Sequence, residues 1–467
     1  MTANEIGSVT QAVAQWSAGL KYSQIPEQVV EYAKVLLLDG IGCSILGVER
    51  DAGRALYRFV TRSAVEKAEA TVWGKNKRLT VQSAALINAT AAHTANVGDT
   101  HRATILHTNY ITPQAAVAIA EQCRSSGKEV LTAIVAGNEV GTRAGMAAHV
   151  GAEGGYFTPE GRGWHATGTF GALAAAVTSG RLLRLSASQM VQAIVIGGTQ
   201  ITGMYRPCGP HMGKHWYAGK AVANGIESAF LAKDGFIAGY RYFEDGLCFG
   251  SGTISPVFDC EAASCELGSR WETLNIDMAI YPAKKIYYPN LDALLHIIKT
   301  EKLQFPQLAR IVVRTAFGTA HDFGIFRKPT SSTDAFNSLR HTIAAAAHDG
   351  EFTFGQLERR KFAHPAIVAF SRDQIEVVQD PVLENLRPQK WPGAVDVHTH
   401  DGRRFSKSVE YHIGQVENPV TKTDVEKKFY AMTARIGRRH SRRILELVSR
   451  LETLSDVLPL ARALWRQ

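Results

Sequence analysis

Apolar residues recur at the three-to-four-residue spacing of buried helices over most of the first 265 positions. Many of the residues between them are Ala and Gly, which favours close packing of one helix on another. The sequence therefore predicts a compact, all-helical bundle in this part of the chain. The segments with the clearest helical pattern are residues 28–46, 81–95, 113–123, 129–149, 169–179 and 187–196.

The pattern changes after about residue 270. Residues 309–316 and 374–380 are rich in β-branched side chains, which favours strands. Residues 394–412 form two alternating runs separated by Asp401 and Gly402. An Asp-Gly pair in this position predicts a β-hairpin with a type I′ turn.

Helical patterns also occur between and after these strands, at residues 334–348 and 354–362 and again from about residue 423. We therefore expect a mainly α protein with two domains. A large all-helical domain would comprise residues 1–268 with 415–467, and a smaller α+β domain would comprise residues 269–414. A cleft between two such domains is a common place for a small-molecule site.

The composition is that of a globular protein, with 467 residues, 45% hydrophobic and 20% charged. No apolar run approaches the roughly 20 residues that cross a bilayer. The first residues lack the basic and apolar regions of a secretion signal. Six scattered cysteines without a CxxC pair argue against a zinc ribbon or a disulfide scaffold. We expect a cytoplasmic protein without a membrane partner.

The net charge of +9 raises the possibility of a nucleic-acid-binding protein. Much of this charge lies in residues 434–450, including the cluster from Arg438 to Arg443, but no aromatic residues are interleaved with it. The segment is more typical of a solvated helix face, so we expect no nucleic-acid partner. Residues 196–204 lack the spacing of a dinucleotide fingerprint, and no phosphate-binding loop is present, so we expect no cofactor.

A metal-dependent hydrolase is a further alternative, because His398, His400 and His412 lie close together in the sequence. They fall in or beside the predicted hairpin and do not form a ligand motif. We therefore interpret them as ordinary polar strand residues and predict no metal site.

Candidate chemistry lies in short polar segments between the helical ones. In the first of these, Asp99, Thr100, His101, Arg102 and His107 occur within nine positions. A carboxylate beside an imidazole can orient the ring and raise its basicity. These residues could therefore take part in catalysis or substrate binding, although Asp99 and Thr100 are also residue types that cap helices.

Two further segments each place a basic group at a helix start. His165 follows Arg162 and precedes a Thr- and Gly-rich helix start, where backbone N–H groups could bind a carboxylate. Lys214 follows a Gly/Pro loop at the mouth of a helix predicted over residues 218–234. Because the helix dipole disfavours a lysine there, an anionic partner would stabilise it.

A fourth segment, residues 281–289, lies where the helical pattern gives way to the α+β pattern. Its Lys284 and Lys285 could reach across an interdomain cleft to a substrate, although exposed lysine pairs are common on surfaces.

The polar segments and their flanks resemble the MmgE/PrpD family, whose members include dehydratases, decarboxylases and epimerases of small carboxylates. The resemblance covers nearly the whole chain and rests on the order and spacing of several motifs. It implies a large helical domain built from both chain ends, a smaller α+β domain, a homodimer, and no metal or organic cofactor. The motifs lie at residues 36–47, 85–101, 162–175, 213–236, 281–283 and 416–429.

The resemblance also assigns site residues. The family's aspartate-threonine pair matches Asp99 and Thr100, and its downstream histidine matches His107. The histidine of its RGFHPTG-like loop matches His165, and its pocket lysine matches Lys214.

The chain departs from the family pattern at three places. Asn96 stands where many members have an acidic residue, and Lys284 stands where the decarboxylase branch has a histidine. The loop at residues 151–161 is also longer and richer in Gly. The first two departures make the pocket more cationic, because an amine is normally protonated where an imidazole is mostly neutral.

The mechanistic hypothesis is cofactor-independent proton transfer at a carbon next to a carboxylate. Arg102, Arg162 and the lysines would hold substrate carboxylates, and His107 or His165 would move the proton. Dehydration, decarboxylation and epimerisation need the same groups, so all three remain open. We favour a lyase over an isomerase.

Overall fold

The structure is a computed structural model that describes residues 8–63, 67–148, 163–204, 211–244, 255, 258–316, 328–386 and 390–465. The chain forms two compact units, Met1–Asp277 with Lys422–Gln467, and Met278–Thr421. The first is built almost entirely of helices and the second combines helices with a sheet, which confirms the predicted mainly α class.

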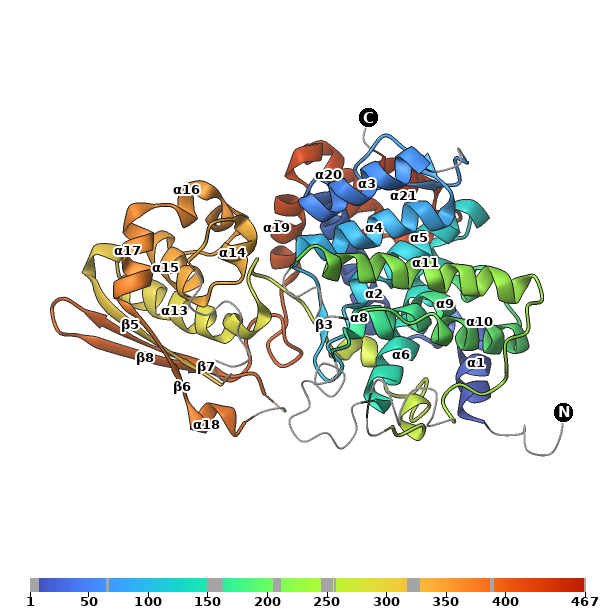
Figure 1. Cartoon of the computed structure of the whole chain (residues 1–467), viewed down its shortest axis with the longest axis horizontal. Helices are drawn as coiled ribbons and strands as arrows, with labels where there is room; N and C mark the ends of the chain where they lie inside the picture. Colours follow the sequence, from blue (N-terminus) through green and yellow to red (C-terminus); the bar gives the residue numbers. More distant parts are fainter. Residues whose placement is uncertain are drawn as a thin grey trace. The chain divides into compact units, whose positions relative to one another are not determined.

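The first unit is a helical bundle (Figure 1). Its central helix is α9, Gly171–Leu182, in which every residue except Arg181 is buried. A Cβ atom added to Gly225 would lie 2.5 Å from Cβ of Ala175, so small residues allow α9 and α11 to pack closely. The other helices from the first part of the chain are α1 Val9–Gly19, α2 Glu27–Gly47, α3 Asp51–Ser63, α4 Val81–Ala95, α5 Thr112–Cys123, α6 Gly127–Ala147, α8 Ala166–Thr169, α10 Ala187–Thr199 and α11 Gly213–Lys233.

Both ends of the chain contribute to this unit. The C-terminal helices α19 Lys422–Met432, α20 Arg438–Ser449 and α21 Leu458–Leu464 lie beside α2 and α5 (Figure 1). Within α20, Ile444 and Val448 are buried whereas Arg438 and Arg442 are exposed. This is the solvated helix face that the sequence predicted for the basic cluster.

Two short strand pairs complete the first unit. Strand β1, Ala70–Thr71, pairs with β2, Arg78–Leu79. Strand β3, Thr100–His101, pairs antiparallel with β4, Ile276–Asp277. The second pair fixes the backbone of the first polar segment against residues far along the chain.

The second unit has a four-stranded sheet with the order β6-β5-β7-β8. Strands β5 and β6 are parallel and the other neighbours are antiparallel. Helices α13, α15 and α17 cover one face (Figure 1). The elements are α13 Tyr288–Glu301, β5 Leu308–Thr315, α14 Ser332–Phe336, α15 Leu339–Asp349, α16 Arg359–Phe362, α17 Pro365–Asp373, β6 Ile375–Gln379, α18 Pro381–Glu384, β7 Gly393–Thr399 and β8 Arg404–Val409.

The predicted hairpin is present, but the predicted turn type is wrong. A type I′ turn needs positive φ at both central residues, and here Gly402 has φ 87° whereas Asp401 has no positive φ. The Asp401 carboxylate instead accepts hydrogen bonds from the Thr399 hydroxyl and, at 3.4 Å, from the Arg403 amide. These bonds stabilise a longer connection than the two-residue turn.

Two predicted helices also differ from the structure. The helix expected over residues 334–348 is two helices, because the Ser338 hydroxyl caps a new helix by accepting the His341 amide at 3.3 Å. The helix expected from residue 218 begins at Gly213. In the described ranges, none of the helices has the length and apolarity needed to span a bilayer.

Candidate active site

Four histidine rings gather inside the first unit. The ring centroid of His93 lies 5.1 Å from that of His215, 5.3 Å from that of His165 and 5.8 Å from that of His107. The rings of His107 and His165 are 6.1 Å apart. Tyr110 packs against the cluster, with its ring centroid 4.9 Å from that of His93. We call these four histidines the imidazole cluster.

The cluster is assembled by ends of helices that are distant in sequence. His93 lies in the last turn of α4, and His107 precedes a short 3₁₀ turn, Thr108–Tyr110. His165 immediately precedes α8, and His215 lies in the first turn of α11. Helix ends can present side chains to a common centre while the helix bodies form the core.

The tautomer of His107 follows from its contacts. Its Nδ1 lies within hydrogen-bonding distance of the backbone carbonyl of Asp99, which can only accept. Nδ1 therefore carries the hydrogen, and a neutral His107 ring has its lone pair on Nε2. The hydroxyl of Thr100 donates to the same carbonyl at 2.6 Å and lies 3.1 Å from His107 Nδ1.

The carboxylate of Asp99 supports the turn that follows His107. It is fully buried, and its Oδ2 accepts hydrogen bonds from the Thr108 hydroxyl at 2.5 Å and the Asn109 amide at 3.0 Å. Asp99 is not the N-cap of this turn or of α5, whose N-caps are His107 and Ile111, so the simple capping role is not observed. Its carboxylate stabilises the turn from a distance, and its backbone carbonyl fixes the His107 ring.

A second layer of buried charge lies beneath this turn. The side-chain amide of Asn109 donates to Asp39 at 2.6 Å, and Lys428 Nζ lies 2.5 Å from the other Asp39 oxygen. Lys428 also donates to the Val97 carbonyl at 2.5 Å. Since Lys428 belongs to α19, the end of the chain helps to hold the first polar segment.

The His165 loop contacts the His107 segment directly. The Thr167 hydroxyl accepts the His107 amide at 3.3 Å, and the His165 amide donates to the Gly203 carbonyl at 2.7 Å. A Cβ atom on Gly168 would lie only 2.6 Å from the Thr202 carbonyl oxygen. Glycine is therefore needed for the loop to approach this closely.

The imidazole cluster is electrostatically biased toward neutral rings. Burial and, to a smaller extent, the neighbouring His107 and Lys214 lower the pKa of His165 to about 3. Burial, His215 and the other rings hold the pKa of His93 well below its usual value. The pKa of His215 is also held well below its usual value by burial, Lys214 and His165, and Arg50 contributes. The cluster therefore disfavours additional positive charge.

Lys214 is a source of that positive charge. It lies in the first turn of α11, because this helix begins at Gly213 and not at residue 218 as the sequence predicted. A cation at this end of a helix is opposed by the helix dipole, as are protonated rings near it. A site of this kind favours an anion over a neutral or cationic molecule.

Three predicted substrate-binding residues lie at the edge of this arrangement. Thr100 contacts His107, as described above. The ring of His101 instead lies 3.0 Å from the Thr104 hydroxyl and 3.2 Å from Glu272, whose pKa is about 2, with the hydrogen bonds from His101 and Asn275 among the causes. Arg102 Nε lies 3.7 Å from Asp277. Roles in substrate binding for these residues remain predictions.

Three other predicted site residues lie outside the described part of the first unit. Arg162 lies outside the described residues. Lys284 and Lys285 belong to the second unit, where Lys284 Nζ lies 5.8 Å from the ring centroid of Tyr287. Their roles also stay predictions.

Sequence reasoning missed His93, His215, Tyr110 and Arg50. His93 falls within an apolar helical pattern, where a single imidazole is more often a core residue, and His215 lies just before the helix predicted from residue 218. One signal was present, because His215 directly follows Lys214 and His93 ends the helix before the first polar segment.

The residue preceding that segment, Asn96, has an identifiable backbone role. It ends α4 in the left-handed conformation, with φ 58°. Asn tolerates this conformation better than most residues. The departure from the family pattern at this position is therefore compatible with the observed helix end.

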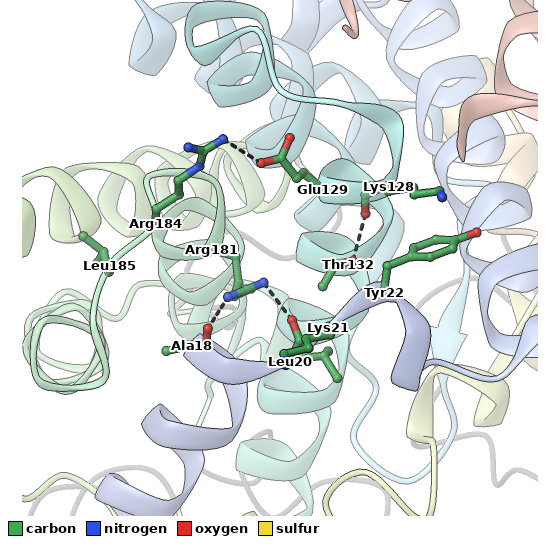
Figure 2. A pocket seen from close by; sticks show the side chains of 10 residues that line it. All are labelled: Ala18, Leu20, Lys21, Tyr22, Lys128, Glu129, Thr132, Arg181, Arg184 and Leu185. Atoms are coloured by element: carbon green, nitrogen blue, oxygen red, sulfur yellow. Dashed lines mark hydrogen bonds and ion pairs between the residues drawn. The ribbon is translucent and has the colours of Figure 1, made fainter. Parts of the chain in front are cut away.

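A surface depression of about 430 Å³ lies elsewhere in the first unit (Figure 2). Its basic side chains do not converge on a common point (Figure 2). Arg181 donates to backbone carbonyls of Ala18 and Leu20, and Arg184 pairs with Glu129 at 3.0 Å. Lys128 lies over the ring of Tyr22. We therefore place the candidate chemistry at the imidazole cluster.

A metal-binding arrangement was also considered. Within the described ranges, no group of three or more His, Cys, Asp or Glu side chains is placed to hold a metal ion. In the imidazole cluster, the 2.9 Å between Nδ1 of His93 and Nδ1 of His215 is instead a hydrogen-bonding distance.

Comparison with known proteins adds independent information. Residues 11–256 match the MmgE/PrpD N-terminal domain and residues 281–453 match the MmgE/PrpD C-terminal domain. The chain is 28% identical to the cis-aconitate decarboxylase-like protein oryM of Aspergillus oryzae, over 97% of this chain and 96% of that protein. It is 26% identical to the cis-aconitate decarboxylase of Aspergillus terreus, over 98% and 96% of the two chains. Identity to the mouse (Mus musculus) cis-aconitate decarboxylase is 24%, over 98% and 93%.

These matches extend over both units and over nearly the full length of each relative. They identify this protein as an enzyme, and as a lyase. The chain belongs to the MmgE/PrpD family.

Proposed function

We propose that this enzyme decarboxylates a small unsaturated di- or tricarboxylate of the cis-aconitate type, without a cofactor, by acid–base proton transfer. The observation that carries the proposal is the imidazole cluster, in which the buried rings of His93, His165 and His215 and the half-buried ring of His107 gather near Lys214. The names of the relatives support the choice of decarboxylation over dehydration and epimerisation.

The reaction must deliver a proton to a carbon atom of the substrate. In a β,γ-unsaturated carboxylate, the bond to the departing CO₂ breaks and its electrons form a new double bond. The electrons of the old double bond take up a proton at the γ carbon. One proton is therefore consumed for each CO₂ released, and the enzyme needs a proton donor and cations that hold the remaining carboxylates.

His107 and His165 are the proposed proton-transferring residues, and a well-placed acid or base contributes about 100- to 10,000-fold to the rate. The orientation of the His107 ring is fixed, because its Nδ1 bonds to the backbone carbonyl of Asp99. Lys214 would bind a carboxylate of the substrate. Asp99 would act by holding His107 in place.

The negative charge of a bound substrate would favour protonated rings in the imidazole cluster, where the protein alone favours neutral ones. Burial and Lys214 keep the pKa values of His165 and His215 low. A bound polycarboxylate adds negative charge near the same rings, and negative charge raises the pKa of an imidazole. Binding would therefore draw a proton into the cluster at the moment when the reaction needs one.

Several further assignments belong to the proposal. Thr100, His101, Arg102 and Arg162 would contact substrate carboxylates, as would Lys284 and Lys285. The family resemblance also leads us to expect a homodimer. We expect the enzyme in the cytoplasm, where scattered free thiols such as Cys123 and Cys265, both exposed, would stay reduced.

The test is to incubate the purified enzyme with cis-aconitate and a panel of di- and tricarboxylates in deuterated water. The expected result is CO₂ release with one solvent deuterium at the carbon that was γ to the lost carboxylate. Loss of water would instead indicate a dehydratase, and deuterium incorporation without loss of either an epimerase. Absence of all three with every substrate contradicts the proposal.

Variants assign the roles. His165→Asn and His107→Asn should each lower kcat at least about tenfold, since each removes a proton-transferring ring. His296→Asn is the matched control, because His296 is an exposed histidine of the second unit. Near-normal rates for either site variant would remove that residue from the mechanism.

A further inference from the structure

His93 and His215 face each other through their Nδ1 atoms, and the reaction proposed above gives neither a role. The two nitrogens are 2.9 Å apart, and the residues are only 3% and 6% exposed. Two ring nitrogens at this distance form a hydrogen bond only when one carries hydrogen and the other a lone pair. The pair therefore shares one hydrogen between its Nδ1 atoms.

His93 has a second ring nitrogen, Nε2, outside the hydrogen bond of the pair. Nε2 is buried and has no hydrogen-bond partner among the described residues. The rings of His165 and His107 are further neighbours of the His93 ring, at centroid distances of 5.3 and 5.8 Å. A buried polar atom without a partner is costly unless a ligand, a water or a proton transfer uses it.

Helix packing fixes this pair. α4 carries His93 and α11 carries His215, and a Cβ atom on Gly219 would lie 2.1 Å from the Thr90 hydroxyl and 2.6 Å from the Leu86 carbonyl oxygen. The glycine lets the two helices approach so closely that the imidazoles meet. The contact is therefore a property of the core and not of a loop.

We propose that His93 and His215 together store the proton that each decarboxylation consumes, and pass it to His165 or His107 through His93 Nε2. The inference rests on the proposed function, which requires a proton donor to be recharged in every turnover. Sharing one positive charge between two rings costs less than burying it on a single ring, because each ring stabilises the protonated form of the other.

The proposed cycle takes one proton from water for each proton that it gives to the substrate. With substrate bound, the pair holds three hydrogens, one between the Nδ1 atoms and one on each Nε2. His93 Nε2 gives its hydrogen to the neutral ring of His165 or His107, and that ring passes a proton to the substrate carbon and is neutral again. The pair is then neutral with two hydrogens, and it takes a proton from water with the next substrate.

The electrostatics of the pair agree with this cycle. Burial and neighbouring cations keep the pKa values of both His93 and His215 well below the ordinary value. The groups responsible are the other imidazoles, Lys214 and Arg50. These groups lower the proton affinity of the pair, and an anion that neutralises them removes this effect, so the proton arrives with the substrate.

The experiment measures proton uptake when the full-length enzyme binds tricarballylate, a saturated tricarboxylate that cannot lose CO₂ by this route. Calorimetry in buffers of different ionisation enthalpy counts the protons. The wild type should take up about one proton per site. His215→Leu should lose this uptake and lower kcat about tenfold or more.

His215→Asn supplies the conservative control. Its amide oxygen can still accept the hydrogen bond from His93 Nδ1, so we expect it to recover part of both the proton uptake and kcat. A residue with a purely structural role would leave the proton count unchanged. His296→Leu, which removes an exposed histidine, should match the wild type in both measurements.

The outcomes separate the two proposals. Undiminished proton uptake in His215→Leu overturns the proton store, whether or not CO₂ is released. Uptake that depends on His215 in an enzyme that releases no CO₂ supports the store and refutes the decarboxylase. Failure of the wild type to bind tricarballylate contradicts both.

Discussion

Stability in mild acid is the most quantitative consequence of the imidazole cluster. Burial lowers the folded-state pKa of His165 to about 3, whereas an unfolded histidine has a pKa of about 6.5. Below pH 6.5 the unfolded chain therefore binds a proton that the folded chain does not. The free energy of unfolding falls as the pH decreases, by about 1.4 kcal/mol for each pH unit and each such group.

For His165 alone this gives about 2 kcal/mol between pH 7.5 and pH 5.0, since pH 5.0 lies about 1.5 units below the unfolded pKa. The lowered pKa values of His93 and His215 act in the same direction. His165→Asn should remove the contribution of His165 to this pH dependence. The free energy of unfolding of the variant should therefore fall by about 2 kcal/mol less than that of the wild type over this interval.

Urea unfolding followed by tryptophan fluorescence measures this difference. Six of the seven tryptophans lie in the first unit and only Trp391 lies in the second, so the signal reports the unit that carries the cluster. His296→Asn serves as the exposed-histidine control. Equal losses of stability for the wild type and His165→Asn between pH 7.5 and 5.0 would refute the assignment of His165 as a buried, neutral ring.

Three other substitutions test separate parts of the site. Lys214→Met should lower kcat/KM at least about tenfold in steady-state assays, because it removes a carboxylate-binding cation. Gly98→Ala would place a Cβ atom 2.3 Å from the Tyr110 ring, and should cost about 1–3 kcal/mol in urea unfolding. Lys428→Met removes the ammonium partner of buried Asp39 and should cost about 3–5 kcal/mol, whereas the double variant that also carries Asp39→Asn should recover part of the loss. Unchanged stability in Gly98→Ala would contradict the packing described here, and unchanged stability in Lys428→Met would contradict the ion pair.

Much of the fold could be predicted from local patterns. The helix predicted over residues 81–95 is α4, Val81–Ala95, because its apolar positions and its Thr80 cap are local signals. The predicted strand pair at residues 394–412 is also present. The turn type was not predictable, because the contacts of the Asp401 side chain with Thr399 and Arg403 decide it.

The site was predictable only in part. His107 and His165 stand in polar segments next to Gly or Thr, and the structure brings their rings together. His93 and His215 are separated by 122 positions and meet because α4 and α11 pack closely at Gly219. No local pattern encodes such a contact, and each histidine by itself has the sequence context of a core residue.

The most direct test of the account is a crystal structure of the enzyme with bound tricarballylate. We predict that one carboxylate of the ligand contacts Lys214 and that the carbon skeleton lies within reach of His107 Nε2 or the His165 ring. Binding in the depression beside Arg181, or at any place from which no ring of the imidazole cluster reaches the ligand, would contradict it.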